Sequence, residues 1–241
     1  MPSQIEKLEA HASHLLDAFI GLRERYEMLD PMLFDKEVPK LHGSGKQSSG
    51  FLILRHSLFL SCAQDIAKLS LDADKRTPSI SNLMTDLSNS TLLDSFREKF
   101  SIWDTPLVEP ETDPEIIEAL KRIDLREIGE RRTQFDELFI QAKNEWESLS
   151  KNPFMDGFST IRDKVSAHTE VQYVADKYQF VDISSFGIKW SDMRKAIELM
   201  QSIVELLGLL IRNTGFAWDM LDVQLSKASN SFWKTASPFA V

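Results

Sequence analysis

An apolar residue recurs at every third or fourth position from residue 5 to residue 29, and this run constrains the fold more than any other feature of the chain. The positions are Ile5, Leu8, Ala12, Leu15, Phe19, Leu22, Tyr26 and Leu29. Such a heptad seam is narrower than the apolar face of a typical globular helix, and it needs a partner helix. Ser3 and Glu6 have the spacing of a capping box, so the sequence predicts a helix over residues 3–29. The partner is either another helix of this chain or a second subunit, and the short length of the run favours the core.

Helical periodicity recurs along the rest of the chain. It predicts helices over residues 51–71, two short ones within 78–103, and longer ones over 114–150, 154–169 and 191–228. Between them we expect a loop over 31–50, an acidic linker over 104–112, and an irregular excursion or small hairpin over 171–188. The sequence therefore predicts one all-α domain over residues 1–241, a helical bundle with long helices.

Capping signals place several helix boundaries. Asp113 followed by Pro114 is a strong helix start, because the acid caps the first turn and proline lacks only a donor that would be unused there. Asn152-Pro153 is expected to end that helix and start the next. We expect Ser79 to start the first short helix, Ser90 or Thr91 to cap the second, Gly129 to loosen the 114–150 helix, and Ser191 to cap the last one.

The residue composition limits the classes of protein to which the chain can belong. Cys62 is the only cysteine, which excludes an internal disulfide and a cysteine-based zinc site. The N-terminal residues are too polar for a signal peptide, and the most apolar stretch, 197–211, is too short to cross a bilayer. These observations predict a cytoplasmic protein without a membrane contact, a metal or a cofactor. Residues 43–46 (GSGK) lack the spacing of a phosphate-binding loop, and His56 is expected to be a core or interface histidine.

The net charge of −9 argues against a protein that coats nucleic acid broadly, since such proteins are normally basic. The acid is unevenly spread, however. Residues 104–118 hold six acidic residues and no Lys or Arg, so the remainder of the chain carries −9 + 6 = −3. A small local site for a phosphate group is compatible with this balance.

One short string, RDKVSAH over residues 162–168, carries chemistry that no other segment offers. Arg162 is a permanent cation that can bind a phosphate through a fork of donors. His168 can exchange protons near neutral pH. On an ideal α-helix, residues six apart are offset by about 240°, so Arg162 and His168 would not share a face, whereas Lys164 and His168 would. The bland alternative is a core histidine, because Ile161, Val165 and His168 are spaced like one buried face.

The string resembles the motif of the HEPN superfamily, in which an arginine is followed by a polar residue, a few more residues and a histidine. The local form R-D-K-x-x-A-H is similar to that of the abortive-infection, AbiU-type branch. The resemblance implies an all-helical protein with a motif helix at about 153–169 that acts as a metal-independent endoribonuclease. It implies that Arg162 binds the scissile phosphate, that His168 moves protons, and that Asp163 orients one of them through hydrogen bonds. Lys164 would contact the RNA backbone or lower the pKa of His168.

The resemblance also implies partners: an RNA substrate, a second copy in a homodimer whose two motifs share a cleft, and a neutralising antitoxin protein. The protein would then be a toxin or a phage-defence effector. Two other functions stay open from the sequence. One is a non-catalytic helical interaction module, which the net charge and the seam at 5–29 favour. The other is an HEPN protein that binds RNA or a nucleotide without cleaving it.

Overall fold

The computed structural model describes residues 3–105, 112–167, 171–174, 177–180 and 187–234. The first helix, α1, spans Gln4–Phe34 and starts with the expected capping box, in which the Glu6 N–H donates to Ser3 Oγ at 3.2 Å and the Ser3 N–H donates to Glu6 Oε2 at 2.7 Å. All seam positions from Leu8 to Leu29 are buried within the single chain. Their partners are α3 (Ser48–Leu71) and α8 (Trp190–Arg212), which pack along α1. The seam therefore forms the core of one protomer.

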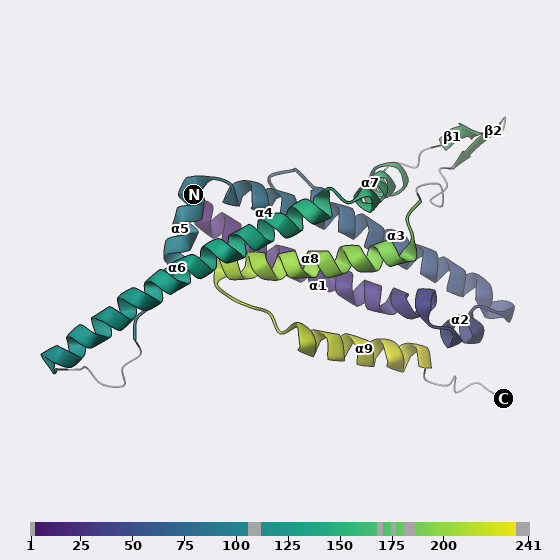
Figure 1. Cartoon of the computed structure of the whole chain (residues 1–241). Helices are drawn as coiled ribbons and strands as arrows, with labels where there is room; N and C mark the ends of the chain where they lie inside the picture. Colours follow the sequence, from purple (N-terminus) through teal and green to yellow (C-terminus); the bar gives the residue numbers. More distant parts are fainter. Residues whose placement is uncertain (1–2, 106–111, 168–170, 175–176, 181–186, 235–241) are drawn as a thin grey trace.

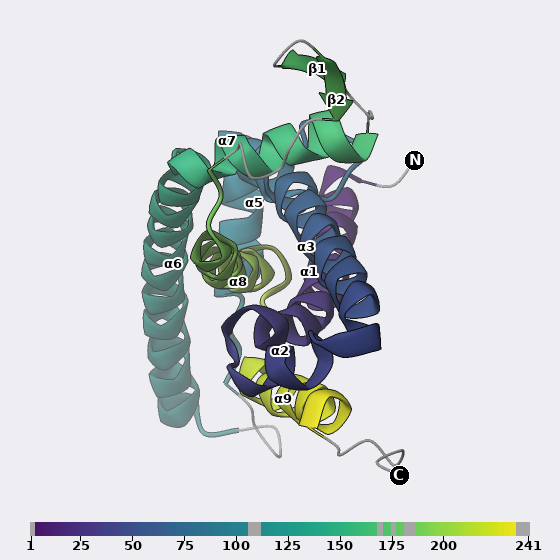
Figure 2. The same cartoon turned by 90° about the vertical axis from the view of Figure 1, so that its right-hand side faces the viewer.

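The bundle is built around the pair α1 and α8. In Figure 2, α8 lies between α1 and the long helix α6 (Pro114–Ser150), while α3 covers the other side of α1. The last helix, α9 (Trp218–Lys234), packs against α1, where Ser229 Oγ donates to the Glu27 carbonyl at 2.8 Å and Trp233 Nε1 donates to the Met28 carbonyl at 3.0 Å. The expected all-α helical bundle is confirmed. No helix of the described ranges is long and apolar enough to cross a membrane.

The predicted loop over residues 31–50 is largely helical instead. Helix α1 continues through Pro31 to Phe34, a short helix α2 follows at Glu37–His42, and a 3₁₀ turn at Gly45–Gln47 leads into α3. Pro31 removes one backbone donor, but the buried Met32 side chain holds the last turn of α1 on the core. Pro39 lies in the first turn of α2, where a missing N–H costs nothing. Of the glycines within residues 31–50, only Gly45 has a positive φ, +65°, a backbone conformation that favours glycine.

The single last helix predicted over 191–228 is two helices. Helix α8 ends at Arg212 and is capped by Asn213, which adopts a left-handed conformation at φ 51°. The chain then turns through Gly215 into α9. Trp218 continues the apolar spacing of α8 in the sequence, but its ring packs edge-on against Phe19 of α1, with 5.8 Å between the centroids. The start is also shifted, since Lys189 rather than Ser191 occupies the N-cap position.

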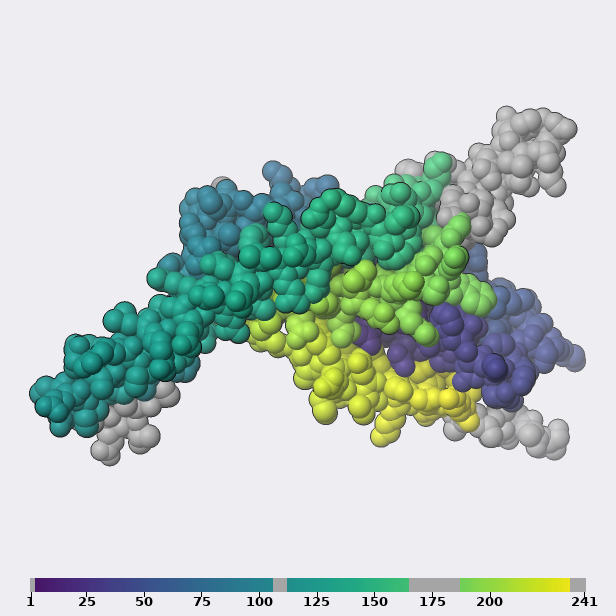
Figure 3. Space-filling view, in the orientation of Figure 1, coloured from purple at the N-terminus to yellow at the C-terminus, as the bar shows by residue number. Residues whose placement is uncertain are grey.

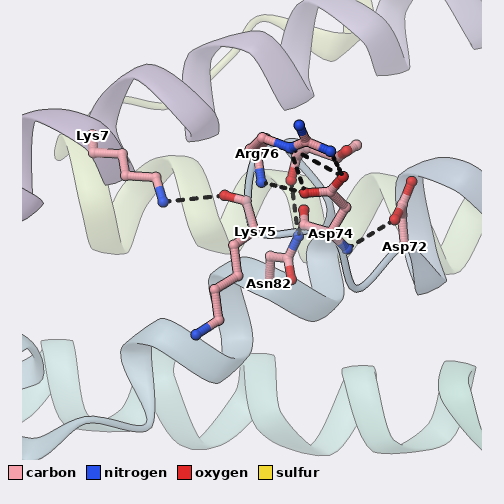
Figure 4. Close-up of polar contacts among 7 residues, drawn as sticks. Lys7, Asp72, Asp74, Lys75, Arg76 and Asn82 are labelled. Atoms are coloured by element: carbon pink, nitrogen blue, oxygen red, sulfur yellow. Dashed lines mark hydrogen bonds and ion pairs between the residues drawn. The ribbon is translucent and has the colours of Figure 1, made fainter.

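The two short helices expected within 78–103 are confirmed as α4 (Ile80–Leu87) and α5 (Ser90–Ser101). Ser79 caps α4 as predicted, whereas Asn89 caps α5, one residue before the predicted cap. The turn that precedes α4 is fixed by polar contacts (Figure 4). Asn82 Nδ2 donates to the carbonyls of Asp74 at 2.7 Å and Thr77 at 2.9 Å, and Lys7 Nζ donates to the Lys75 carbonyl at 3.1 Å. The two Asn82 bonds hold the turn on α4, and the Lys7 bond ties it to α1.

Helix α6 begins at the predicted Asp113-Pro114 signal and runs through Gly129 without a break. Its buried residues are Phe135, Ala142 and Leu149, so the first half of the helix stands away from the bundle as an arm (Figures 1 and 3). Only the ends of the acidic linker at 104–112 fall in the described ranges, and there the Thr105 N–H donates to Asp124 Oδ1 of the arm at 3.1 Å.

The expected hairpin is present. Strands β1 (Val171–Val174) and β2 (Lys177–Phe180) pair antiparallel, with Val171 opposite Phe180 and Val174 opposite Lys177. The hairpin projects from the end of the bundle where α7 (Pro153–Thr160) lies (Figure 1).

Removal of a seam side chain tests this arrangement. Phe19 of α1 is fully buried, and its ring contacts the ring of Trp218 of α9. We expect Phe19→Ala to lower the free energy of unfolding by about 3–5 kcal/mol, because it removes buried apolar area and leaves a cavity. Urea denaturation followed by circular dichroism measures this. The control is Leu125→Ala on the arm, where the side chain is 70% exposed and the change should stay within about 0.5 kcal/mol. Equal effects of the two substitutions would contradict a seam buried within one chain.

Candidate functional site

Helix α7 anchors the RDKVSAH segment to the bundle. Asn152 caps the helix and Pro153 occupies its first turn, as the sequence predicted. Met155 and Phe158 are buried, and the Phe154 and Phe158 rings contact edge-on with 6.0 Å between their centroids. This apolar face packs against α3. The position of the motif is therefore set by the same helix that covers α1.

At Ile161 the helix changes its hydrogen-bonding pattern. Residues Ile161–Ala167 form a π-helix, η2, in which each N–H bonds to the carbonyl five residues earlier. Ile161 is fully buried, and η2 packs against α3. The prediction of one α-helix over 154–169 is thus wrong for its second half, and the α-helical offset of about 240° does not describe Arg162 and His168. Single-turn π segments occur frequently at functional sites.

The structure brings Arg162 and Asp163 together. The Arg162 Nε–H donates to Asp163 Oδ1 at 2.8 Å, and the two side chains are 28% and 56% exposed. The carboxylate binds one edge of the guanidinium, and no other described residue bonds to Arg162. Among the described residues, none occupies its two terminal nitrogens, which are the donors that could bind an anion.

Of the other two predicted site residues, Lys164 lies within the described part of the chain and His168 does not. Lys164 lies on η2 and is exposed. His168, the predicted proton-transfer residue, lies outside the described residues. The pairing of Arg162 with His168, and a core position for His168, both stay predictions.

A second feature near the motif escaped the sequence analysis. His56 is exposed on α3 rather than in the core, and together with Arg55 it lines a pocket closed by Trp190 at the start of α8. Residues 55 and 190 are too far apart in the chain for any local pattern to connect them. The one available signal was an Arg-His pair on an otherwise apolar helix.

A polar cavity of about 410 Å³ between α1, α8 and α9 is a competing site. Asp30 accepts hydrogen bonds from Tyr26 Oη at 2.9 Å and from Arg194 Nη2 at 2.6 Å, and Arg23 donates to Gln201 and Asp222. Burial raises the pKa of Tyr26. Four carboxylates and two guanidiniums line the cavity, so its charge repels phosphate. These contacts join α1 to α8 and α9.

Other nucleophile and metal chemistry finds little support in the described part of the chain. Cys62 is buried, and desolvation raises the pKa of its thiol to about 12, which leaves it protonated at neutral pH. Among the described residues, no group of three or more His, Cys, Asp or Glu side chains could hold a metal ion.

The profile of the HEPN AbiU2 family matches residues 5–232. The chain belongs to this family. The match spans the bundle from the first seam residue to the last turn of α9, and it includes η2. The predicted membership of the AbiU-type, abortive-infection branch of HEPN proteins is therefore confirmed. No curated protein and no solved structure matches this chain.

Glu27, which lines the polar cavity, should make the stability of this HEPN protein depend on pH. Burial, and secondarily the nearby Asp30, raises the pKa of Glu27 above its ordinary value. A carboxyl with a raised folded-state pKa stabilises the fold below its unfolded pKa, and that contribution is lost as the pH rises through the folded-state pKa. We therefore expect Glu27→Gln to raise the free energy of unfolding at pH 7 by up to about 1 kcal/mol. The gain should disappear near pH 4.

Urea denaturation at several pH values measures this difference. The matched control is Glu24→Gln, at an exposed position of the same helix, where we expect no pH-dependent gain. A Glu27→Gln protein that is less stable than wild type at pH 7 would show that the carboxylate is net favourable there.

Proposed function

We propose that this HEPN protein is a metal-independent endoribonuclease that serves as a toxin or a phage-defence effector. The observation that carries the proposal is Arg162, held along its Nε edge by Asp163 within the RDKVSAH motif of an AbiU2 family member. A guanidinium fixed in this way presents its terminal donors to the oxygens of one phosphate.

The proposed reaction needs no nucleophile from the protein. The 2′-OH of the RNA attacks the adjacent phosphorus, and the bond from phosphorus to the 5′-oxygen breaks. His168 accepts the proton from the 2′-OH or donates one to the leaving 5′-oxygen, and water takes up or supplies the other proton. Arg162 stabilises the negative charge that develops on the phosphate oxygens, and Asp163 orients Arg162. The products are a 2′,3′-cyclic phosphate and a 5′-OH end.

A homodimer completes the proposed site. Two motifs that face one cleft would place Arg162 of one protomer near His168 of the other, and they would double the local positive charge. Lys164, exposed on η2, adds a further cation for the RNA backbone. A toxin of this kind also needs a neutralising antitoxin, which we propose as its protein partner.

The non-catalytic interaction module is a weaker alternative. The seam at residues 5–29 had favoured it, but these side chains are buried inside one chain and offer no surface to a partner. The net charge of −9 still favours it, although six of the acidic residues lie within 104–118, outside the motif.

The proposal predicts the outcome of substitutions in the motif. We expect His168→Ala and Arg162→Ala each to lower the rate of RNA cleavage by about 10²–10⁴-fold, because proton transfer and charge stabilisation contribute effects of this size. Purified full-length protein is incubated with labelled single-stranded RNA, and mass spectrometry identifies the 2′,3′-cyclic phosphate ends.

The control is His14→Ala, an exposed histidine near the start of α1, which should cleave at the wild-type rate. Retained cleavage by a well-folded His168→Ala protein would overturn the assigned role. Loss of activity with a chelator, restored by a divalent metal, would contradict the metal-independent mechanism.

The composite cleft predicts complementation between two inactive variants. We expect the wild-type protein to have twice the mass of the 27.6 kDa chain in sedimentation equilibrium. Co-expressed Arg162→Ala and His168→Ala chains should regain cleavage, because a mixed dimer contains one intact Arg162 and one intact His168 on opposite sides of the cleft. A strictly monomeric but active enzyme would rule out the shared cleft.

A further inference from the structure

A pocket of about 480 Å³ opens between α3, the end of α1 and the segment that leads into α8. Its apolar walls come from Leu52 and Phe59 of α3 and from Ile188 and Trp190. Trp190 is 45% exposed, so one face of a large aromatic ring is accessible to solvent. Exposed aromatic surface of this kind is expensive to leave uncovered and is typical of a binding site.

The polar groups of this pocket are all basic or neutral. The Arg55 guanidinium lies over the Trp190 ring, 5.6 Å from its centroid, and His56 is exposed beside it. Among the described residues, no carboxylate lines the pocket, and neither Arg55 nor His56 makes an ion pair or a hydrogen bond with another of them. In a chain with a net charge of −9, this basic lining is favourable for an anion.

The pocket is lined by α3, and the motif lies on η2, which packs against the same helix. The π-helix η2 packs against α3, the chain then forms the β1–β2 hairpin, and it returns to α3 at Ile188 and Trp190. Figure 1 shows α7, from which η2 continues, near the end of the bundle from which strands β1 and β2 project. A flexible polymer bound at Arg162 can therefore extend along α3 to this pocket.

We propose that this pocket is a subsite for one nucleotide of single-stranded RNA, outside the scissile phosphate. The base stacks on Trp190 within the apolar walls, and Arg55 binds the adjoining phosphate with donors that its stacking leaves free. His56 donates a further hydrogen bond to the same backbone. An unpaired base enters such a pocket without the cost of unpairing, so the subsite favours single-stranded over paired RNA. The assignment of RNA as ligand rests on the proposed function.

Binding measured without cleavage tests the subsite. Full-length His168→Ala protein is titrated with a fluorescein-labelled single-stranded decaribonucleotide, and anisotropy gives the dissociation constant. We expect Trp190→Leu and Arg55→Gln, each added to His168→Ala, to weaken binding at least about fivefold, the lower end for loss of one stacked base. Trp190→Phe keeps a stacking surface and should retain most of the affinity.

The matched control is Arg126→Gln on the distant arm of α6, where Arg126 is paired with Glu127 and Glu130, and it should leave the affinity unchanged. An RNA affinity unchanged by Trp190→Leu and Arg55→Gln would overturn the subsite, as would no RNA binding at all. Pocket-dependent binding with no cleavage by the wild-type protein would support the subsite and overturn the nuclease instead. Cleavage by the wild-type protein with no effect of the pocket variants on binding would support the nuclease and overturn the subsite.

Discussion

The burial of the apolar face of α1 by α3, α8 and α9 positions every other part of the molecule. Phe19 and Leu22 lie at the centre of this contact and are fully buried. Each large side chain buried there contributes about 1.5–3 kcal/mol relative to leaving it exposed. Helix α3 is held on α1 by this contact and in turn holds α7, η2 and one wall of the pocket that contains Trp190. The chemistry of the motif is therefore displayed on a rigid element of the core and not on a free loop.

Local signals were enough where a helix boundary depends on adjacent residues. The Ser3–Glu6 capping box and the Asp113-Pro114 start are both present in the structure, because each satisfies backbone donors within one turn. The boundaries that failed depend on distant contacts. The sequence predicts a loop from residue 31, but α1 continues to Phe34, where the buried Met32 holds its last turn on the core. Trp218 had the spacing of one long helix, but it packs on Phe19 from a separate helix.

The difference between local and distant contacts also decides which features of the site the sequence could predict. Arg162 and Asp163 could be recognised from the sequence, and their contact joins neighbours in the chain. The π-helix could not be predicted, because no residue type in the motif marks a change of backbone hydrogen bonding. The pairing of Arg55 with Trp190 was also hidden, since it requires the chain to return to α3 after the hairpin.

The net charge of −9 does not oppose RNA at this site, because of where the acid lies. Six of the acidic residues fall within 104–118, and those of them in α6 are Glu115 and Glu118, at the tip of the arm. The helix has 37 residues, which at 1.5 Å per residue separates its tip from α7 by about 55 Å. The Debye length at physiological salt is about 8 Å, so repulsion from the arm is screened out well before the motif. In the described part of the chain the motif presents Arg162 with its partner Asp163 and the exposed Lys164, so the RNA site proposed there is not governed by the charge of the distant arm.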